Sequence, residues 1–494
     1  MRLGIDFGTT RTVVAVCDRG NFPVVGFDGP DDSVVDWWPT VAAVRGDEVL
    51  YGWEAAAKLG VRGWSIVRSL KRLLATSGHA DTVRLGREKL PVVDVVAGFL
   101  TALRRDLLER SNLPVAVDED EPLEAMIAVP AGSSSAQRFV MLDAFRLAGF
   151  QVVGLVNEPS AAGIEYAHRY RKTLTSQRED VLVYDLGGGT FDVSLVRMAD
   201  GDHEVLAHAG DNHLGGDDVD AELLRLAMSD AGRDASSLDE DERTALLEHC
   251  RAQKERLTPN TKKITVDLDD DTTVTVTTAA LYEACEWLVE RSLEAARSVL
   301  PGDGEEALEH LAGVYVVGGA SDLPIVARKL KEVFGRRVKR SAYPSASTAV
   351  GLAIAFEEAP SLTERFSRTF GVFRELRSGE DVAFDVLVTP DAEVGSEGAS
   401  WVRRYRAAHN VGCFRFAECD RVEGGLPVGD LLPWGEIRFA FDPAAREDEQ
   451  APIERLEGPG PLVEERYRVL PSGMVEVEIT DLDSGFSQQY RLGA

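Results

Sequence analysis

The chain has 494 residues, and its 83 acidic against 54 basic residues give a formal net charge of −29. This length exceeds what one hydrophobic core supports and predicts about three or four domains. The acidic excess argues against nucleic-acid and anionic-lipid partners, so a phosphate site must be built locally from backbone N–H groups, lysine or metal. The five cysteines form no Cys-x-x-Cys pair, and no apolar run approaches the roughly 18 residues of a membrane span. We therefore expect a cytoplasmic protein without a membrane partner.

Two stretches far apart in the chain, residues 3–16 and 181–198, share one pattern. In each, an apolar strand ends in an aspartate, glycines and hydroxyl residues follow, and a second strand begins. Each pattern predicts a β-hairpin whose turn carries a carboxylate, and glycine there lets the backbone approach a ligand closely. Two such turns facing each other would hold a metal ion and a polyphosphate between them.

Strands and helices alternate through residues 1–177, with a smaller insertion at 34–97 that contains a hairpin at 41–51. The elements expected after the insertion are a helix at 93–108, a strand at 125–129, a helix at 137–148, a strand at 152–156 and a helix at 161–170.

Residues 178–358 repeat this order around an insertion at 216–297. The elements expected after the glycine-rich hairpin are helices at 221–229 and 241–257, a hairpin at 264–276, a helix at 279–299, a strand at 313–317 and helices at 323–334 and 345–357. Two halves with the same alternation, each interrupted once, predict a duplicated α/β fold with two lobes.

The pattern changes after a linker at 359–366. Residues 367–494 show short strands of alternating polarity and predict a small all-β sandwich domain, with residues 443–465 as a long acidic loop. No helical segment follows the last expected strand, so we expect this domain to lack a helical lid.

Five segments taken together resemble a known family. The segments are Gly4–Thr10, Val156–Ala162, Asp185–Asp192, His213–Asp218 and Val317–Gly319. The first, third and fifth are similar to the two phosphate segments and the adenosine segment of the actin-like ATPases. The other two narrow the resemblance to the seventy-kilodalton heat-shock chaperones, the DnaK-like family. The resemblance runs in order through residues 1–357, and residues 365–494 resemble that family's peptide-binding β-sandwich more weakly.

The resemblance implies a two-lobed actin-like (ribonuclease-H-like) ATPase domain followed by the β-sandwich. It implies a chaperone-like ATPase that slowly hydrolyses ATP to ADP with Mg²⁺ and couples nucleotide state to the binding of an unfolded or extended polypeptide. A J-domain co-chaperone and a nucleotide-exchange factor are the protein partners that the resemblance implies.

The resemblance also assigns roles to individual residues. Asp6 and Asp185 would hold hydrated Mg²⁺, because a hard cation prefers carboxylate and water oxygens. Lys71 would lie beside the γ-phosphate, Glu158 at the water shell of the metal, and Thr190 would position the attacking water. The remaining nucleotide-binding candidates are Gly8, Thr9, Thr10, Gly187, Gly188, Gly189, Gly215, Gly216, Lys254, Thr258, Gly318 and Gly319.

Alternatives remain open at this stage. Lys71 lies in a basic stretch that could simply be solvated, and Glu158 could be a helix-start carboxylate favoured by the helix dipole. The family's adenine-stacking arginine is replaced by Asp322, and Arg251 stands where the family has a glutamate. Loss of one arginine stack is worth about 0.5–2 kcal/mol. The second hypothesis is therefore a nucleotide-sensing scaffold with negligible turnover that binds a dedicated protein partner.

Overall fold

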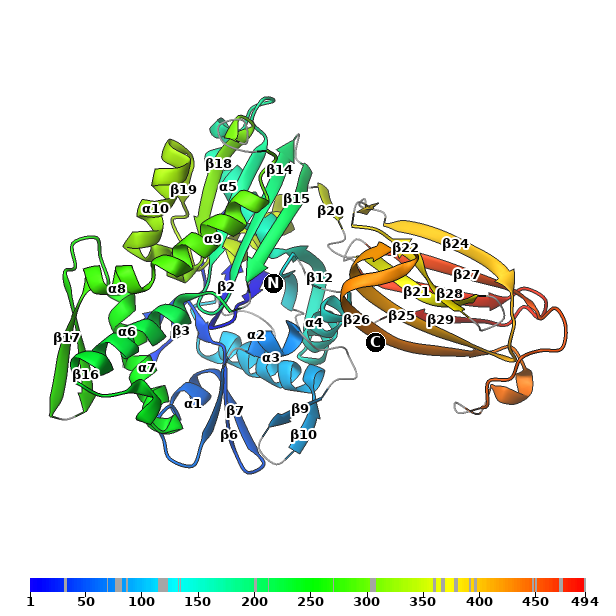
Figure 1. Cartoon of the computed structure of the whole chain (residues 1–494), viewed down its shortest axis with the longest axis horizontal. Helices are drawn as coiled ribbons and strands as arrows, with labels where there is room; N and C mark the ends of the chain where they lie inside the picture. The colour runs from blue at the N-terminus through cyan, green and yellow to red at the C-terminus, as the bar shows by residue number, and fades with distance from the viewer. Residues whose placement is uncertain are drawn as a thin grey trace.

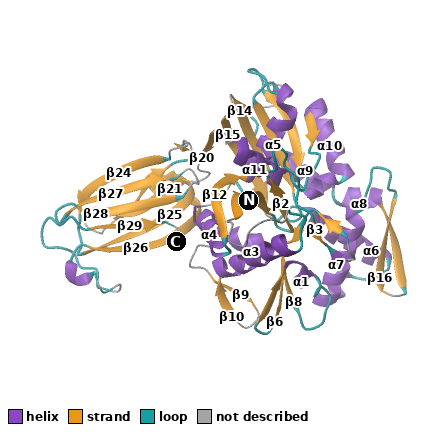
Figure 2. Cartoon of the chain, turned by 180° about the vertical axis from the view of Figure 1, so that it is seen from behind, coloured by secondary structure: helices purple, strands orange, loops and turns teal. Residues whose placement is uncertain are grey.

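The structure is a computed structural model of the chain, shown in Figures 1 and 2. It describes all residues except 31–32, 69, 76–81, 86–87, 114–122, 132, 134, 200–201, 212, 270, 303–307, 359–360, 366–368, 377–380, 391, 395–397, 447, 449–450, 471–473 and 493–494. An α/β part is formed by the first three quarters of the chain, and a part made mostly of strands lies beside α4 (Ser135–Leu147) and β12 (Phe150–Asn157). None of the described helices is long and apolar enough to cross a membrane.

A five-stranded sheet forms the centre of the first lobe, in the order β12-β11-β1-β2-β5. The other strands are β1 (Arg2–Phe7), β2 (Arg11–Val16), β5 (Trp38–Pro39) and β11 (Leu123–Val129). Strand β1 pairs antiparallel with β2 and parallel with β11, which confirms the first predicted hairpin. One face of the sheet packs against α3 (Val92–Glu109) and α4 in a shared core that includes Ile5, Phe99 and Phe145.

The insertion in the first lobe contains two small sheets and two short helices. Their bounds are β6 (Val41–Arg45), β7 (Glu48–Tyr51), β8 (Ser65–Arg68), β9 (Thr82–Leu85), β10 (Glu88–Pro91), α1 (Gly52–Ala56) and α2 (Leu70–Ala75). The predicted hairpin at 41–51 is confirmed by the antiparallel pairing of β6 with β7. A further two-stranded ribbon joins β3 (Phe27–Asp28) to β4 (Val34–Val35).

A seven-stranded sheet forms the centre of the second lobe, in the order β19-β18-β13-β14-β15-β20-β23. The strands are β13 (Asp180–Leu186), β14 (Phe191–Ala199), β15 (Asp202–Asp211), β18 (Leu311–Val317), β19 (Val338–Arg340), β20 (Ser361–Arg365) and β23 (Glu393–Val394). Strand β13 pairs antiparallel with β14 and parallel with β18. This is the arrangement of β1, β2 and β11, so the two halves repeat one α/β plan.

Helices α5 (Glu158–Tyr170) and α11 (Ser347–Glu358) pack together between the two sheets. Glycines allow this close approach. A Cβ atom at Gly351 would overlap the backbone of Ala161 in α5, and one at Gly4 would overlap the carbonyl oxygen of Ala349 in α11. The contact between the lobes therefore depends on positions where no side chain fits.

The segment that we expect to be a linker, 359–366, takes part in the second sheet. Over Ser361–Arg365 it forms β20, which pairs parallel with β15 and antiparallel with β23. Residues 359–360 and 366 lie outside the described residues. The edge of β15 offers backbone N–H and C=O groups, and an extended segment satisfies them whatever its side chains are.

The insertion in the second lobe consists of helices and one hairpin. The elements are α6 (Gly216–Asp230), α7 (Glu240–Glu255), β16 (Lys263–Asp269), β17 (Thr272–Thr277), α8 (Thr278–Ala284) and α9 (Glu286–Ser298), followed after β18 by α10 (Pro324–Phe334). Helix α7 begins where the Asp239 side chain accepts a hydrogen bond from the backbone N–H of Glu242. The prediction of one helix over 279–299 is wrong, because Cys285 leaves the helical conformation and separates α8 from α9.

The C-terminal part contains two antiparallel four-stranded sheets. Their orders are β22-β21-β25-β26 and β24-β27-β28-β29. The bounds are β21 (Thr369–Leu376), β22 (Asp381–Val388), β24 (Ala399–Arg406), β25 (Val411–Glu423), β26 (Leu426–Ala440), β27 (Leu462–Val469), β28 (Val475–Asp481) and β29 (Ser487–Arg491). Both sheets contribute side chains to one core. The prediction of a loop through residue 465 is wrong at its end, because β27 begins at Leu462 and pairs with β24.

Candidate active site between the two lobes

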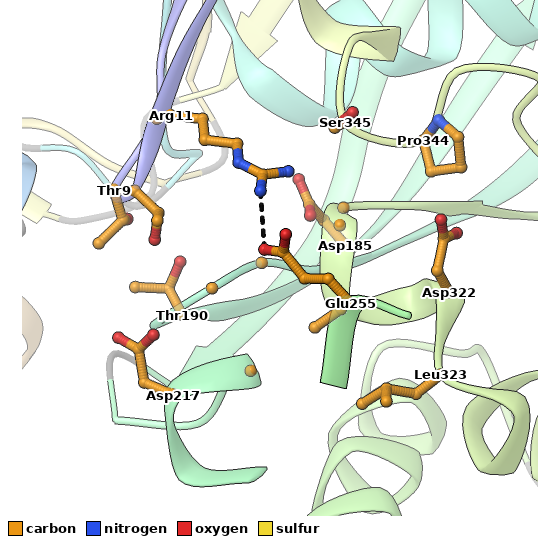
Figure 3. Close-up of a pocket in the computed structure, with 18 of the residues that line it drawn as sticks. Thr9, Arg11, Asp185, Thr190, Asp217, Glu255, Asp322, Leu323, Pro344 and Ser345 are labelled. Carbon is orange, nitrogen blue, oxygen red and sulfur yellow. Dashed lines mark hydrogen bonds and ion pairs between the residues drawn. The ribbon is translucent and has the colours of Figure 1, made fainter. Parts of the chain in front are cut away.

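The two glycine-rich turns line one cavity of about 320 Å³ between the lobes (Figure 3). The other walls come from α2, the first turns of α5 and α6, the end of α7 and the segment after β18. The predicted site residues that line it are Asp6, Gly8, Thr9, Thr10, Lys71, Glu158, Asp185, Gly187, Gly188, Thr190, Gly216, Lys254, Gly318 and Gly319.

The two turns face each other at close range. A Cβ atom at Gly188 would overlap the hydroxyl oxygen of Thr10, so glycine is needed where the turns meet. The start of α6 is hydrogen-bonded to the second turn, since Gly216 N donates to Gly187 O at 3.0 Å and Asp217 N donates to Gly188 O at 2.6 Å. These bonds hold the N-terminus of α6 against the second turn at the border of the cavity.

Lys71 and Glu158 meet at the cavity although they lie on different elements. Lys71, in the first turn of α2, donates a hydrogen bond to the carboxylate of Glu158, the first residue of α5. Their side chains are only 14% and 13% exposed. The alternative of a solvated basic stretch thus does not describe Lys71. Burial alone lowers its pKa, but the carboxylates of Glu158 and Asp6 outweigh burial and raise it.

Buried carboxylates outnumber the lysine at this site. Burial raises the pKa of Asp6 to about 7; the Lys71 ammonium lowers it in part, and Glu158 raises it. Burial and the neighbouring Glu158 carboxylate also raise the pKa of Asp192 to about 7 and hold that of Asp185 well above its usual range. A cation would relieve this repulsion by stabilising the ionised forms.

The donor set fits a hydrated Mg²⁺ ion better than a metal held by protein ligands alone. Within the described residues, no group of three or more His, Cys, Asp and Glu residues is arranged to hold a metal ion. Mg²⁺ usually keeps several waters and shares its coordination between one or two carboxylates and substrate phosphates. Asp6 and Asp185 would supply those carboxylates.

Lys254 holds the start of α6 in place. Its ammonium group, which is buried, donates to the carbonyl oxygen of Gly216 at 2.7 Å and to the carboxylate of Asp220 at 2.8 Å. The predicted nucleotide-binding lysine therefore lines the cavity and at the same time neutralises a carboxylate that is 2% exposed.

Ion pairs engage several charged side chains of the cavity lining. Figure 3 shows Arg11 and Glu255 reaching toward each other from opposite lobes, and their side chains lie 2.7 Å apart. Asp322 pairs with Arg340. Arg251 pairs with Asp217 at 2.8 Å and is therefore directed into the acidic start of α6. Leu257, Leu323 and Pro344 add apolar atoms to the lining of the cavity.

Three of the predicted binding residues do not line the cavity: Gly189, Gly215 and Thr258. Gly215 instead packs on the second turn, where a Cβ atom would lie 2.6 Å from Gly188 O. Thr258 follows the end of α7, is exposed, and has its hydroxyl 3.0 Å from that of Thr261.

The cavity residues that were not predicted from the sequence include two carboxylates, Asp192 and Glu255. Asp192 lies opposite Asp185 in the β13–β14 pairing. The length of the glycine turn therefore could have indicated from the sequence that the two carboxylates are neighbours. Glu255 follows Arg251 by four positions on α7, a spacing that places both on one helix face.

Comparisons with known proteins agree with this geometry. A family model described as Hsp70 protein matches residues 82–357, more than half of the chain. A Chaperone protein HscA homolog from Bordetella pertussis is 34% identical over 375 residues, which are 72% of this chain and 57% of that protein. The homolog from Colwellia psychrerythraea is 32% identical over 365 residues, 71% of this chain and 57% of that protein.

The chain spans 57% of the length of these relatives, so the match concerns a part of them. The family match and the repeated β-hairpin plan identify the α/β part as a two-lobed fold of the actin-like ATPase type. The chain belongs to the Hsp70 family.

Proposed function

We propose that the chain is a chaperone-like ATPase that binds ATP with Mg²⁺ in the cavity between the lobes and hydrolyses it slowly to ADP. The observation that carries this proposal is the meeting of both carboxylate turns with the Lys71–Glu158 pair in one cavity. Phosphoryl transfer needs charge neutralisation and a positioned water more than covalent chemistry.

The residues supply these needs as follows. The backbone N–H groups of the two turns and the hydroxyls of Thr9 and Thr10 donate to phosphate oxygens. Lys71 neutralises charge on the transferred phosphoryl group, and the Glu158 carboxylate keeps the ammonium in place. Thr190 orients the attacking water. Mg²⁺, when bound, would neutralise phosphate charge beside Asp6 and Asp185.

The domain assignment is part of the same proposal. Residues 1–177 and 178–358 form the two lobes, and residues 367–494 form a β-sandwich that binds an unfolded or extended polypeptide. Strand β20 adds the segment before the sandwich to the second lobe's sheet, which gives lobe movement a direct path to the sandwich. The relatives are named Chaperone protein HscA homolog, which supports a chaperone role. A J-domain partner and a nucleotide-exchange factor would be needed for that role.

Single-turnover hydrolysis of ATP with excess protein tests the catalytic assignment. Lys71→Ala and Asp185→Ala should each lower the rate by about 10²–10³-fold. The first removes the ammonium that neutralises the phosphoryl group, and the second removes a carboxylate that would hold Mg²⁺. Lys329→Ala is the matched control, since Lys329 pairs with Glu286 and Glu290 away from the cavity. Hydrolysis that survives both cavity substitutions would refute the assignment.

A nucleotide-sensing scaffold with negligible turnover is the second candidate. It is favoured by the ion pairs Arg11–Glu255 and Asp322–Arg340, which engage charged side chains of the cavity lining with partners in the protein. Calorimetry with ATP, ADP and GTP separates the candidates: tight binding without turnover supports the scaffold, and no binding to any of them at about 1 mM, near −4 kcal/mol, excludes both.

A further inference from the structure

A second cavity of about 220 Å³ lies between the lobes, beside the first glycine turn. It adjoins the nucleotide cavity and extends toward the first-lobe insertion. The two linings share Thr9, Thr10, Arg11, Asp217, Arg251 and Glu255. Its apolar lining comes mainly from Trp37, Val41, Trp53, Ala56, Leu59 and Ala252. Small-molecule sites combine such a lining with a few polar groups of defined direction.

Two of the polar groups in this lining lack a partner. Trp53 Nε1 and Arg68 Nη2 are buried, and neither has a hydrogen-bond partner within the described part of the chain. Both atoms are donors. A buried donor without an acceptor is unfavourable and rare in native proteins, so two beside one cavity indicate a ligand that carries acceptor oxygens.

The nearest carboxylate is already shared. Glu248 accepts from Arg68 Nη1 at 2.7 Å and from Arg251 Nη1 at 3.1 Å. Arg251 has a further partner in Asp217, and Arg11 is paired with Glu255. Arg68 and Arg11 each pair with one carboxylate, but Arg68 Nη2 has no acceptor among the described residues, and a guanidinium donor favours an anionic acceptor over a neutral one.

The aromatic lining defines the rest of the ligand. The rings of Trp37 and Trp53 have centroids 5.0 Å apart, and the Arg11 guanidinium lies 4.4 Å over the Trp37 ring. Both indoles are half-buried, and although Arg11 covers part of the Trp37 ring, the two rings give the lining flat aromatic faces. Such faces bind a planar ring system better than a flexible chain, because a rigid ring loses little conformational freedom.

We propose that this cavity is a second ligand site, next to the nucleotide site, for a small planar aromatic carboxylate. The ring system lies against Trp37 and Trp53, and the carboxylate accepts hydrogen bonds from Trp53 Nε1 and Arg68 Nη2.

Calorimetric titration of the full chain, without nucleotide, tests the site directly and does not depend on the proposed ATPase activity. The probe is 2-naphthoate, and 2-naphthamide is its neutral counterpart. We expect 2-naphthoate to bind with a dissociation constant below about 1 mM and the amide to bind about tenfold more weakly.

Variants locate the probe. Arg68→Gln should weaken 2-naphthoate binding by about tenfold or more, and Trp53→Phe, which keeps the ring but removes the donor, by about threefold or more. Glu248→Gln also breaks the Arg68–Glu248 pair but frees the guanidinium, so it should keep or tighten binding. Arg45→Gln is the matched control, since Arg45 lies over Trp64 and pairs with Glu48 in the same insertion but outside the cavity.

Some outcomes would overturn the proposal. They are no measurable binding of 2-naphthoate at about 1 mM, equal affinity for the amide, or unchanged affinity in Arg68→Gln. A loss in Glu248→Gln equal to that in Arg68→Gln would overturn it as well, because binding would then depend on the link between the lobes and not on the Arg68 donor.

Discussion

Gly215 tests how closely the second turn and helix α6 must fit. Its φ is −174°, an extended conformation that any residue adopts, so backbone strain does not require glycine there. Space does. A Cβ atom at this position would lie 2.6 Å from Gly188 O and 2.8 Å from Gly188 C, where ordinary contact begins at 3.4 Å. Both neighbours are backbone atoms, so Gly215→Ala must displace the turn or the helix by about 0.8 Å.

That displacement should separate the groups that act on phosphate. It stretches the bonds from Gly216 N to Gly187 O and from Asp217 N to Gly188 O, each worth about 0.5–1.5 kcal/mol. A misplacement of about 1 Å lowers catalytic rates by about 10²-fold. Gly215→Ala should therefore lower single-turnover hydrolysis of ATP by about that factor.

A matched control separates the site from general crowding. A Cβ atom at Gly154 would lie 2.5 Å from Met126 Sδ, a nominal overlap as severe as that at Gly215. The methionine thioether can move aside, because Met side chains are flexible. Gly154→Ala should keep the wild-type rate. A folded Gly215→Ala protein that hydrolyses ATP within about twofold of the wild-type rate would refute the reasoning.

The other predictions concern metal dependence and buried charges. Asp185→Asn should lower hydrolysis by about 10²–10³-fold, and removal of Mg²⁺ from the unmodified chain by a chelator should have a similar effect. Lys254→Met leaves the buried Asp220 carboxylate without its ammonium partner and should lower the free energy of unfolding by about 3–5 kcal/mol in denaturant titration. Glu465→Leu leaves the Arg374 guanidinium inside the C-terminal core without its bidentate partner at 2.7 Å, and should destabilise that part by about 3–5 kcal/mol.

Exposed pairs provide the comparison for these losses. Lys329→Met removes a lysine that pairs with Glu286, and Glu436→Gln weakens a surface pair with Arg415 at 3.1 Å. Each should lower stability far less than the buried substitutions do, because solvent screens exposed charges. If the surface and buried substitutions lowered stability equally, burial would not be the cause.

The sequence allowed much of the fold to be predicted because its signals are local. The periodicity at 93–108 predicted α3, and the apolar strands flanking the glycine turns predicted both hairpins, whose antiparallel pairing is observed. Errors arose where local signals are weak. Cys285 divides one expected helix, and β20 forms because the edge of β15 is available, not because its side chains favour a strand.

The part of the candidate site that lies in recognisable sequence motifs was predicted. The glycine turns were recognised because glycine lets the backbone approach a ligand closely, and Lys71 was assigned from the family resemblance. Asp192 and Glu255 were missed because a carboxylate that follows a turn or ends a helix usually faces solvent. Only the pairing of β13 with β14 and the packing of α7 bring them to the cavity.

What the sequence determined by itself is the set of backbone turns, because glycines after an aspartate-ending strand allow a tight turn that residues with a Cβ atom disfavour. What the tertiary structure decided is which charges meet. Lys71 reaches Glu158 only when the first lobe folds, and Arg11 reaches Glu255 and Arg68 reaches Glu248 only when the two lobes assemble. Electrostatic and hydrogen-bonding energies depend on distance and burial, and those are properties of the assembled lobes and not of positions along the chain.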